Sequence, residues 1–120
     1  KVTAQLNTFH YSVIDQIPGV DKQAAMDNFP AMRVALQAGT IDAYVSELPE
    51  AISAQAANSD FVMVKLTDGF KASPEDTQTA VGVKKDSPLT KEINEALKTI
   101  SSEERQQIMQ DAIKNQPAAE

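Results

Sequence analysis

The sequence predicts an α/β protein with a mainly parallel, doubly wound sheet, and residues 33–51 give the main reason. This stretch is typical of a helix end, a turn at Gly39, a short strand over residues 41–45, and a second helix that begins at Pro49. A glycine favours the left-handed cap that ends many helices, and proline is common in a first helical turn. Residues 41–45 are rich in β-branched and aromatic side chains between turn signals, which indicates a strand. Helix, strand and helix in such close succession are typical of parallel α/β layers.

The residues before this stretch predict the first elements of the same sheet. Apolar Val2, Ala4 and Leu6 alternate with polar residues, which indicates a strand. Residues 9–17 are expected to form a short helix, and Thr8 occupies its N-cap position. Residues 23–26 predict a weak second strand, after which a helix runs to Ala38 with Asn28 as its N-cap and Pro30 in its first turn.

The residues after it predict two more strands and two amphipathic helices. Apolar residues 61–66 and 80–83 indicate strands, which gives a sheet of five strands. A helix is expected from Pro88 to Ile100, and a capping box of Ser101 and Glu104 opens the last helix, while residues 116–120 are expected to fray.

Composition excludes several classes of function. The formal net charge is −6, which disfavours binding to nucleic acid or to an anionic membrane surface. The chain has no cysteine and a single histidine, His10, so neither a metal site nor a Ser-His-Asp triad is expected. Its four glycines form no phosphate-binding loop. We therefore expect no catalytic residues, no metal and no cofactor.

Two strand ends carry the candidate binding residues. The strand over residues 41–45 is followed by Ser46 and Glu47, and the first strand is followed by Thr8 at a helix start, where free backbone amides attract an anion. Strand ends in an open parallel sheet share one edge. The residues after these two strands together suit a zwitterion, with its carboxylate at Thr8 and its ammonium at Glu47. Two simpler interpretations stay open: Thr8 only caps its helix, and His10 is a surface or cap residue.

Three blocks of sequence together resemble the family 3 extracellular solute-binding proteins, the two-lobed receptors of polar-amino-acid ABC importers. The blocks are VTAQLNT, ALQAGTIDAYVSELPEA and AVGVKKDSPLTKEINEALKTI, and they agree with the family in order and spacing. Within the second block, residues 38–51 fit the most specific signature of the family.

The resemblance covers nearly the whole chain but only about half of the family's protein, and the abrupt start of the chain at Lys1 is likewise typical of a fragment. It implies a type II periplasmic-binding-protein-like fold in which residues 1–79 form lobe 2. Residues 80–120 would supply a crossover strand and the C-terminal helices that return to lobe 1. Lobe 1, which in the family carries an arginine for the ligand carboxylate, would be missing.

The resemblance also implies roles for particular residues. The acidic ligand of the substrate ammonium falls on Glu47, where many members have Asp. The Gly-Thr pair that meets the substrate carboxylate falls on Asn7 and Thr8, with a side chain at the glycine position. Gln5 and Phe9 flank this corner and are expected to line the pocket.

The expected function is therefore binding rather than catalysis. The resemblance implies an extracytoplasmic receptor, periplasmic or anchored as a cell-surface lipoprotein, that delivers a polar amino acid to an ABC permease. Two alternatives are an input domain of a membrane sensor and a dehydratase-like enzyme on the same fold. With one wall of the cleft absent, the chain is expected to bind amino acids weakly at best. It is also expected to self-associate through the apolar stripes of its last two helices.

Overall fold

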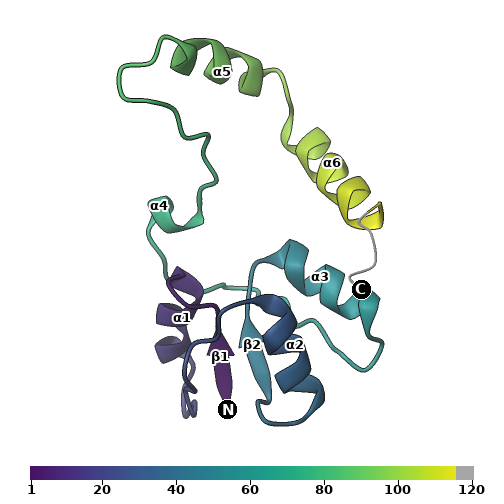
Figure 1. Cartoon of the computed structure of the whole chain (residues 1–120). Coiled ribbons are helices and arrows are strands. Elements are labelled where there is room, and N and C mark those ends of the chain that lie inside the picture. Colours follow the sequence, from purple (N-terminus) through teal and green to yellow (C-terminus); the bar gives the residue numbers. More distant parts are fainter. Residues whose placement is uncertain (116–120) are drawn as a thin grey trace. The chain divides into compact units, whose positions relative to one another are not determined.

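The computed structural model describes residues 1–115, and over these residues the chain is a small α/β protein with six α-helices and a two-stranded parallel sheet (Figure 1). It divides into two compact units, Lys1–Thr77 and Gln78–Glu120. The first unit contains the sheet and α1 to α4, and the second contains α5 and α6. The α/β class predicted from the sequence is confirmed, but the sheet is much smaller than the five strands predicted.

The sheet pairs the first strand of the chain with the strand at the centre of the predicted α/β layer. Strand β1 (Val2–Ala4) runs parallel to β2 (Ala43–Val45), with Ala4 opposite Val45. On the other side of β1, residues 21–26 run parallel to it through two isolated bridges. The predicted strand at residues 23–26 is thus present only as a bridged segment.

The chain begins at the middle one of these three parallel positions and visits the two sides in turn. From β1 the chain passes through α1 (Phe9–Val13) and the 3-10 helix η1 (Ile14–Gln16) to the bridged segment. It then returns through α2 (Phe29–Gln37) to β2, which lies on the other side of β1. Because parallel crossovers are right-handed, two crossovers in opposite directions place their helices on opposite faces of the sheet. The helix that follows β1 and the helix that precedes β2 therefore lie on opposite faces of the sheet, which makes the boundary between these two strands a topological switch point.

Local signals position α2, β2 and α3. The side chain of Asn28 accepts a hydrogen bond from the amide of Ala31 at 2.9 Å, which confirms the predicted N-cap of α2. Gly39 follows that helix with φ +71°, a conformation that glycine adopts without strain. Helix α3 (Leu48–Ala57) begins directly after β2, with Glu47 as its N-cap residue and Pro49 in its first turn.

The core lies around β1 and includes a polar residue that the alternating pattern assigns to the surface. Thr3 is fully buried, and its hydroxyl donates to the carbonyl oxygen of Ala24 at 2.7 Å, whereas Leu6 is 49% exposed. Both faces of β1 are thus covered, whereas alternating apolar and polar residues predict one buried face and one exposed face. The buried apolar residues are Ala4, Val13, Ile14, Met32, Ile41 and Ala54.

Two predicted strands are wrong. Residues 61–66 and 80–83 form no strand, and Val62 and Val64 are 82% and 75% exposed. An apolar, β-branched segment becomes a strand only where a neighbouring edge accepts its backbone hydrogen bonds. Among the described residues, neither segment pairs with a strand: β1 pairs with β2 and bridges to residues 21–26. The predicted crossover strand at the start of residues 80–120 is corrected in the same way.

The second unit consists of two helices joined by a capped turn. Helices α5 (Leu89–Lys98) and α6 (Ser102–Lys114) have the predicted positions, and the Ser101 hydroxyl accepts from the amide of Glu104 at 3.1 Å. The guanidinium of Arg105 donates to the carbonyl oxygens of Leu97 and Ile100, which satisfies the end of α5.

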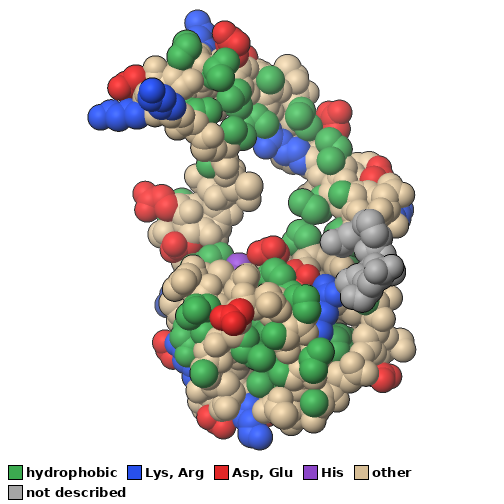
Figure 2. All heavy atoms as spheres, in the orientation of Figure 1, with side chains coloured by type: hydrophobic (Ala, Val, Ile, Leu, Met, Phe, Trp, Pro, Cys, Tyr) green, Lys and Arg blue, Asp and Glu red, His purple; other side chains and the backbone are tan. Residues whose placement is uncertain are grey.

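None of the described residues of this second unit is buried, and Figure 2 shows hydrophobic side chains on its surface. The fraying predicted for residues 116–120 lies outside the described residues. Among the described helices, none has both the length and the hydropathy required of a membrane span.

Candidate functional site

The candidate site is the edge of the sheet at which β1 and β2 end, and we call residues 5–10 and 46–48 the carboxyl edge. Because Ala4 pairs with Val45 in a parallel ladder, the segments that follow the two strands leave the sheet side by side. Thr8 and Glu47 therefore belong to the same edge, beside the switch point between the strands. This juxtaposition was predicted from the sequence, and the ligand roles of the two residues stay a prediction.

Asn7 and Thr8 turn the chain from β1 into α1. Asn7 has φ +60°, a left-handed conformation that glycine and asparagine adopt more readily than other residues. Thr8 is the N-cap residue of α1, but its hydroxyl donates to the carbonyl oxygen of Gln5 at 2.7 Å and makes no capping bond. The first amides of α1 are thus not satisfied by the Thr8 side chain.

Gln5 and Phe9 flank this turn in different ways. The Gln5 amide donates to the carbonyl oxygen of Asp27 at 3.1 Å, so it ties the edge to the neighbouring segment. The Phe9 ring lies against the ring of His10, with centroids 4.2 Å apart. Phe9 also lines an open groove of about 410 Å³ with residues of α1, η1 and the segment before α4 (Pro74–Thr77). The amide of Gln16 holds that segment by bonding both the N–H and the carbonyl oxygen of Lys71 at 2.8 Å.

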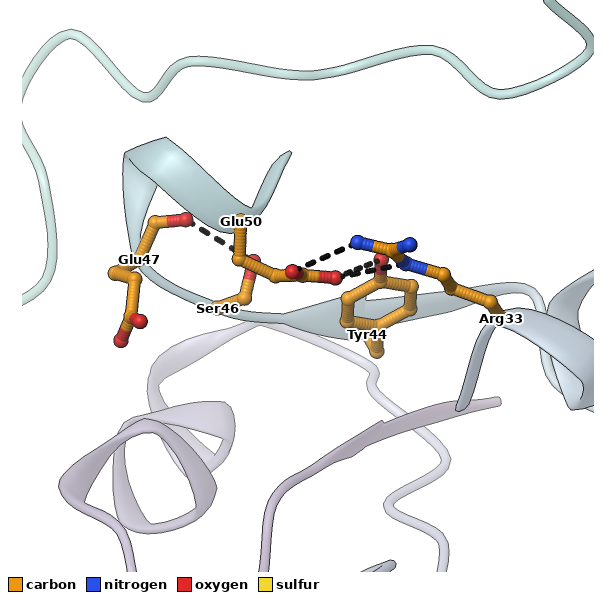
Figure 3. Close-up of polar contacts among 5 residues, drawn as sticks. All are labelled: Arg33, Tyr44, Ser46, Glu47 and Glu50. Atoms are coloured by element: carbon orange, nitrogen blue, oxygen red, sulfur yellow. Dashed lines mark hydrogen bonds and ion pairs between the residues drawn. The ribbon is translucent and has the colours of Figure 1, made fainter. Parts of the chain in front are cut away.

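Glu47 presents an exposed carboxylate that has no hydrogen bond or ion pair among the described residues. In Figure 3 its side chain points away from Glu50, while the Ser46 hydroxyl donates to the Glu47 carbonyl oxygen at 3.3 Å. His10 is near enough to be affected by this charge. Partial burial lowers the pKa of His10 below its ordinary 6.5, and the negative charge of Glu47 partly offsets that effect.

These groups define what the edge can do. A carboxylate without a partner attracts a cation, and amides at a helix start attract an anion. The edge thus offers complementary charges for one small zwitterion. Among the described residues, no group of three or more His, Cys, Asp or Glu side chains is placed to hold a metal ion.

Beside the edge lies a cluster that the sequence did not predict, which we call the Glu50 cluster: Arg33, Tyr44 and Glu50. The Arg33 guanidinium donates to both carboxylate oxygens of Glu50, at 3.0 and 2.8 Å, and the Tyr44 hydroxyl donates to one of them at 3.2 Å (Figure 3). The side chains of Arg33 and Glu50 are 23% and 10% exposed. Partial burial, followed by the charge of Glu50, raises the pKa of Tyr44. Its members lie on three elements, so no local sequence signal connects them.

Comparisons with known protein families, with curated proteins and with solved structures found no match to this chain.

Proposed function

We propose that the chain is the second lobe, with the C-terminal helices, of a two-lobed extracytoplasmic receptor that binds a polar amino acid for an ABC importer. The three sequence blocks that resemble family 3 solute-binding proteins support this proposal. The observation that carries it is the parallel pairing of Ala4 with Val45, because it puts Thr8 and Glu47 at one switch point.

The residues of the carboxyl edge would divide the recognition of one amino acid. The exposed Glu47 carboxylate would pair with the α-ammonium group of the ligand. The first amides of α1, which Thr8 leaves without a side-chain acceptor, would bind the α-carboxylate. The left-handed turn at Asn7 supports this role, because it is the conformation that a glycine at this position would adopt.

Binding by one lobe would be incomplete. The carboxyl edge lies at the surface of its unit, and Glu47 is exposed. A charged pair in water is weak, whereas the same pair in a closed cleft is strengthened by the lower dielectric constant. Closure of the second lobe would supply that desolvation and the remaining contacts, and the loaded receptor would then dock on a membrane permease.

One observation supports a second candidate, a dehydratase-like enzyme on the same fold. The charge of Glu47 acts on His10, and an imidazole beside a carboxylate at the carboxyl edge would supply the groups that general acid–base chemistry uses. A binding protein returns its ligand unchanged. Mass spectrometry of the amino acid after prolonged incubation with the protein separates the two functions, and the receptor proposal predicts no product.

The experiment that tests the receptor proposal is calorimetric titration of the two-lobed protein with polar amino acids. Glu47→Ala should cost about 2–5 kcal/mol of binding free energy, as expected when one member of a desolvated charge pair is removed. Asp68→Ala is the matched control, because it removes an exposed carboxylate outside the carboxyl edge. Wild-type affinity in Glu47→Ala would remove Glu47 from the site.

A further inference from the structure

The Glu50 cluster joins the three elements that surround the turn between β2 and α3. Arg33 lies on α2, Tyr44 on β2 and Glu50 in the first turn of α3. Glu50 is the third residue of its helix, from which a glutamate often bonds back to its own N-cap. Here both of its oxygens bond to other elements instead. The Glu50 side chain thus attaches the start of α3 to α2 and β2 rather than to its own N-cap residue.

Glu47 is the N-cap residue of that same helix, so its backbone is bonded to the first turn. Its carbonyl oxygen accepts from the amide of Ala51 at 3.2 Å and from the Ser46 hydroxyl at 3.3 Å. Glu50 and Glu47 leave the first turn in different directions (Figure 3). A rotation or shift of the first turn would therefore move the Glu47 carboxylate.

From this geometry we propose that the Glu50 cluster positions Glu47: it holds the first turn of α3 so that the free carboxylate is presented at the carboxyl edge. A bidentate arginine–carboxylate pair fixes orientation as well as distance, which suits such a role. The pair is mostly shielded from water, so its geometry is less easily exchanged for solvent contacts than that of an exposed pair. The importance of the Glu50 cluster for ligand binding rests on the proposed function, but the effect of the cluster on Glu47 does not.

The test uses the His10 imidazole as a reporter of the position of Glu47. The His10 pKa, measured by NMR on the full chain without ligand, should fall in Glu47→Gln, because the charge that raises it is gone. Arg33→Gln should also lower the His10 pKa, because the released carboxylate no longer stays near the ring.

The sign of this effect distinguishes positioning from direct electrostatics. Removal of the Arg33 positive charge would by itself raise the pKa of a nearby imidazole. A fall therefore has the sign that displacement of Glu47 predicts, opposite to the sign of the lost Arg33 charge. Combined with Glu47→Gln, the Arg33 substitution should cause no further fall, which a double-mutant cycle measures.

Tyr44→Phe and Arg33→Lys are the conservative variants, since each keeps the net charge and removes one or two of the hydrogen bonds. Each should lower the His10 pKa by a smaller amount than Arg33→Gln, and they decide the question if Arg33→Gln does not fold. Glu95→Gln on α5, which removes an exposed ion pair in the second unit, should leave the His10 pKa unchanged.

A wild-type or raised His10 pKa in the folded Arg33 and Tyr44 variants would overturn the positioning role. Failure of amino acids to bind would instead overturn the proposed function and leave these pKa results unaffected.

Discussion

Both units of this chain contain helices that carry apolar side chains, yet among the described residues only the first unit has a core. In Lys1–Thr77, seven residues are buried around β1, whereas no described residue of Gln78–Glu120 is buried. The apolar stripes of α5 and α6 were sufficient to predict two helices, because apolar residues recur along them with the spacing of a helical turn. A core requires a further condition, which is that several elements present their stripes to one another. The comparison shows that periodicity predicts an element without predicting what covers it.

The largest expected effect contrasts two methionines, one in each unit. Met32 is fully buried and Met109 is 48% exposed. Met32→Ala should cost the first unit about 2–5 kcal/mol of unfolding free energy, because it leaves a cavity. Met109→Ala, its matched control, should change that value by less than about 0.5 kcal/mol. Equal losses in urea titrations would show that the second unit shares the core of the first.

The apolar surface of the second unit predicts self-association of the chain. Leu89 and Ile108 are 52% and 55% exposed, and burial of such side chains contributes roughly 1.5–3 kcal/mol each. Light scattering at micromolar concentration should detect a dimer or larger species, and Leu97→Glu should shift it toward monomer. Lys91→Glu is the control, since it changes charge on α5 without removing an apolar side chain. A clean wild-type monomer would contradict this prediction.

Removal of an N-cap side chain should affect stability differently in the two units. Asn28 caps α2 and Ser101 caps α6, each by one bond to a backbone amide. Asn28→Ala should lower the unfolding free energy of the first unit by about 1 kcal/mol, because α2 carries buried Met32. Ser101→Ala should increase amide exchange in α6 alone. A shift of the main unfolding transition in Ser101→Ala would mean that α6 is coupled to the core.

The smallest effect is a pH dependence confined to the first unit. Because burial lowers the pKa of His10 in the folded chain, the unfolded chain binds more protons as the pH falls through 6.5. The unfolding free energy should therefore decrease from neutral pH toward the folded-state pKa, and His10→Gln should remove this component. Urea titrations at pH 7.5 and 5.5 make the comparison. An identical decrease in His10→Gln would assign the pH dependence to other groups.

The sequence predicted those features that short-range signals determine. Asn28 with Pro30, Gly39 and Ser101 mark helix ends correctly, because caps and left-handed turns depend on a few neighbouring residues. The shared edge of Thr8 and Glu47 followed from the rule for parallel strand ends, once β1 and β2 were recognised.

Features that depend on distant partners were missed. Residues 61–66 have the composition of a strand, but they pair with no strand among the described residues. Thr3 is buried because the bridged segment supplies an acceptor for its hydroxyl at Ala24, twenty-one residues away. The Arg33–Glu50 pair spans seventeen residues and two helices, so it depends on how those helices pack. The pattern of neighbouring residues in the sequence therefore does not predict these contacts.

The central claim is that the carboxyl edge of the first unit binds an amino acid, and an NMR titration tests it most directly. Amide shifts of the full chain would be followed while polar amino acids are added to millimolar concentration, in the wild type and in Glu47→Gln. We expect weak binding, with shifts confined to residues 7–10 and 46–48 and absent in Glu47→Gln. Unchanged amides at these residues, or equal shifts in Glu47→Gln, would contradict the claim. Submicromolar binding by this chain alone would contradict its assignment as one wall of a two-lobed cleft.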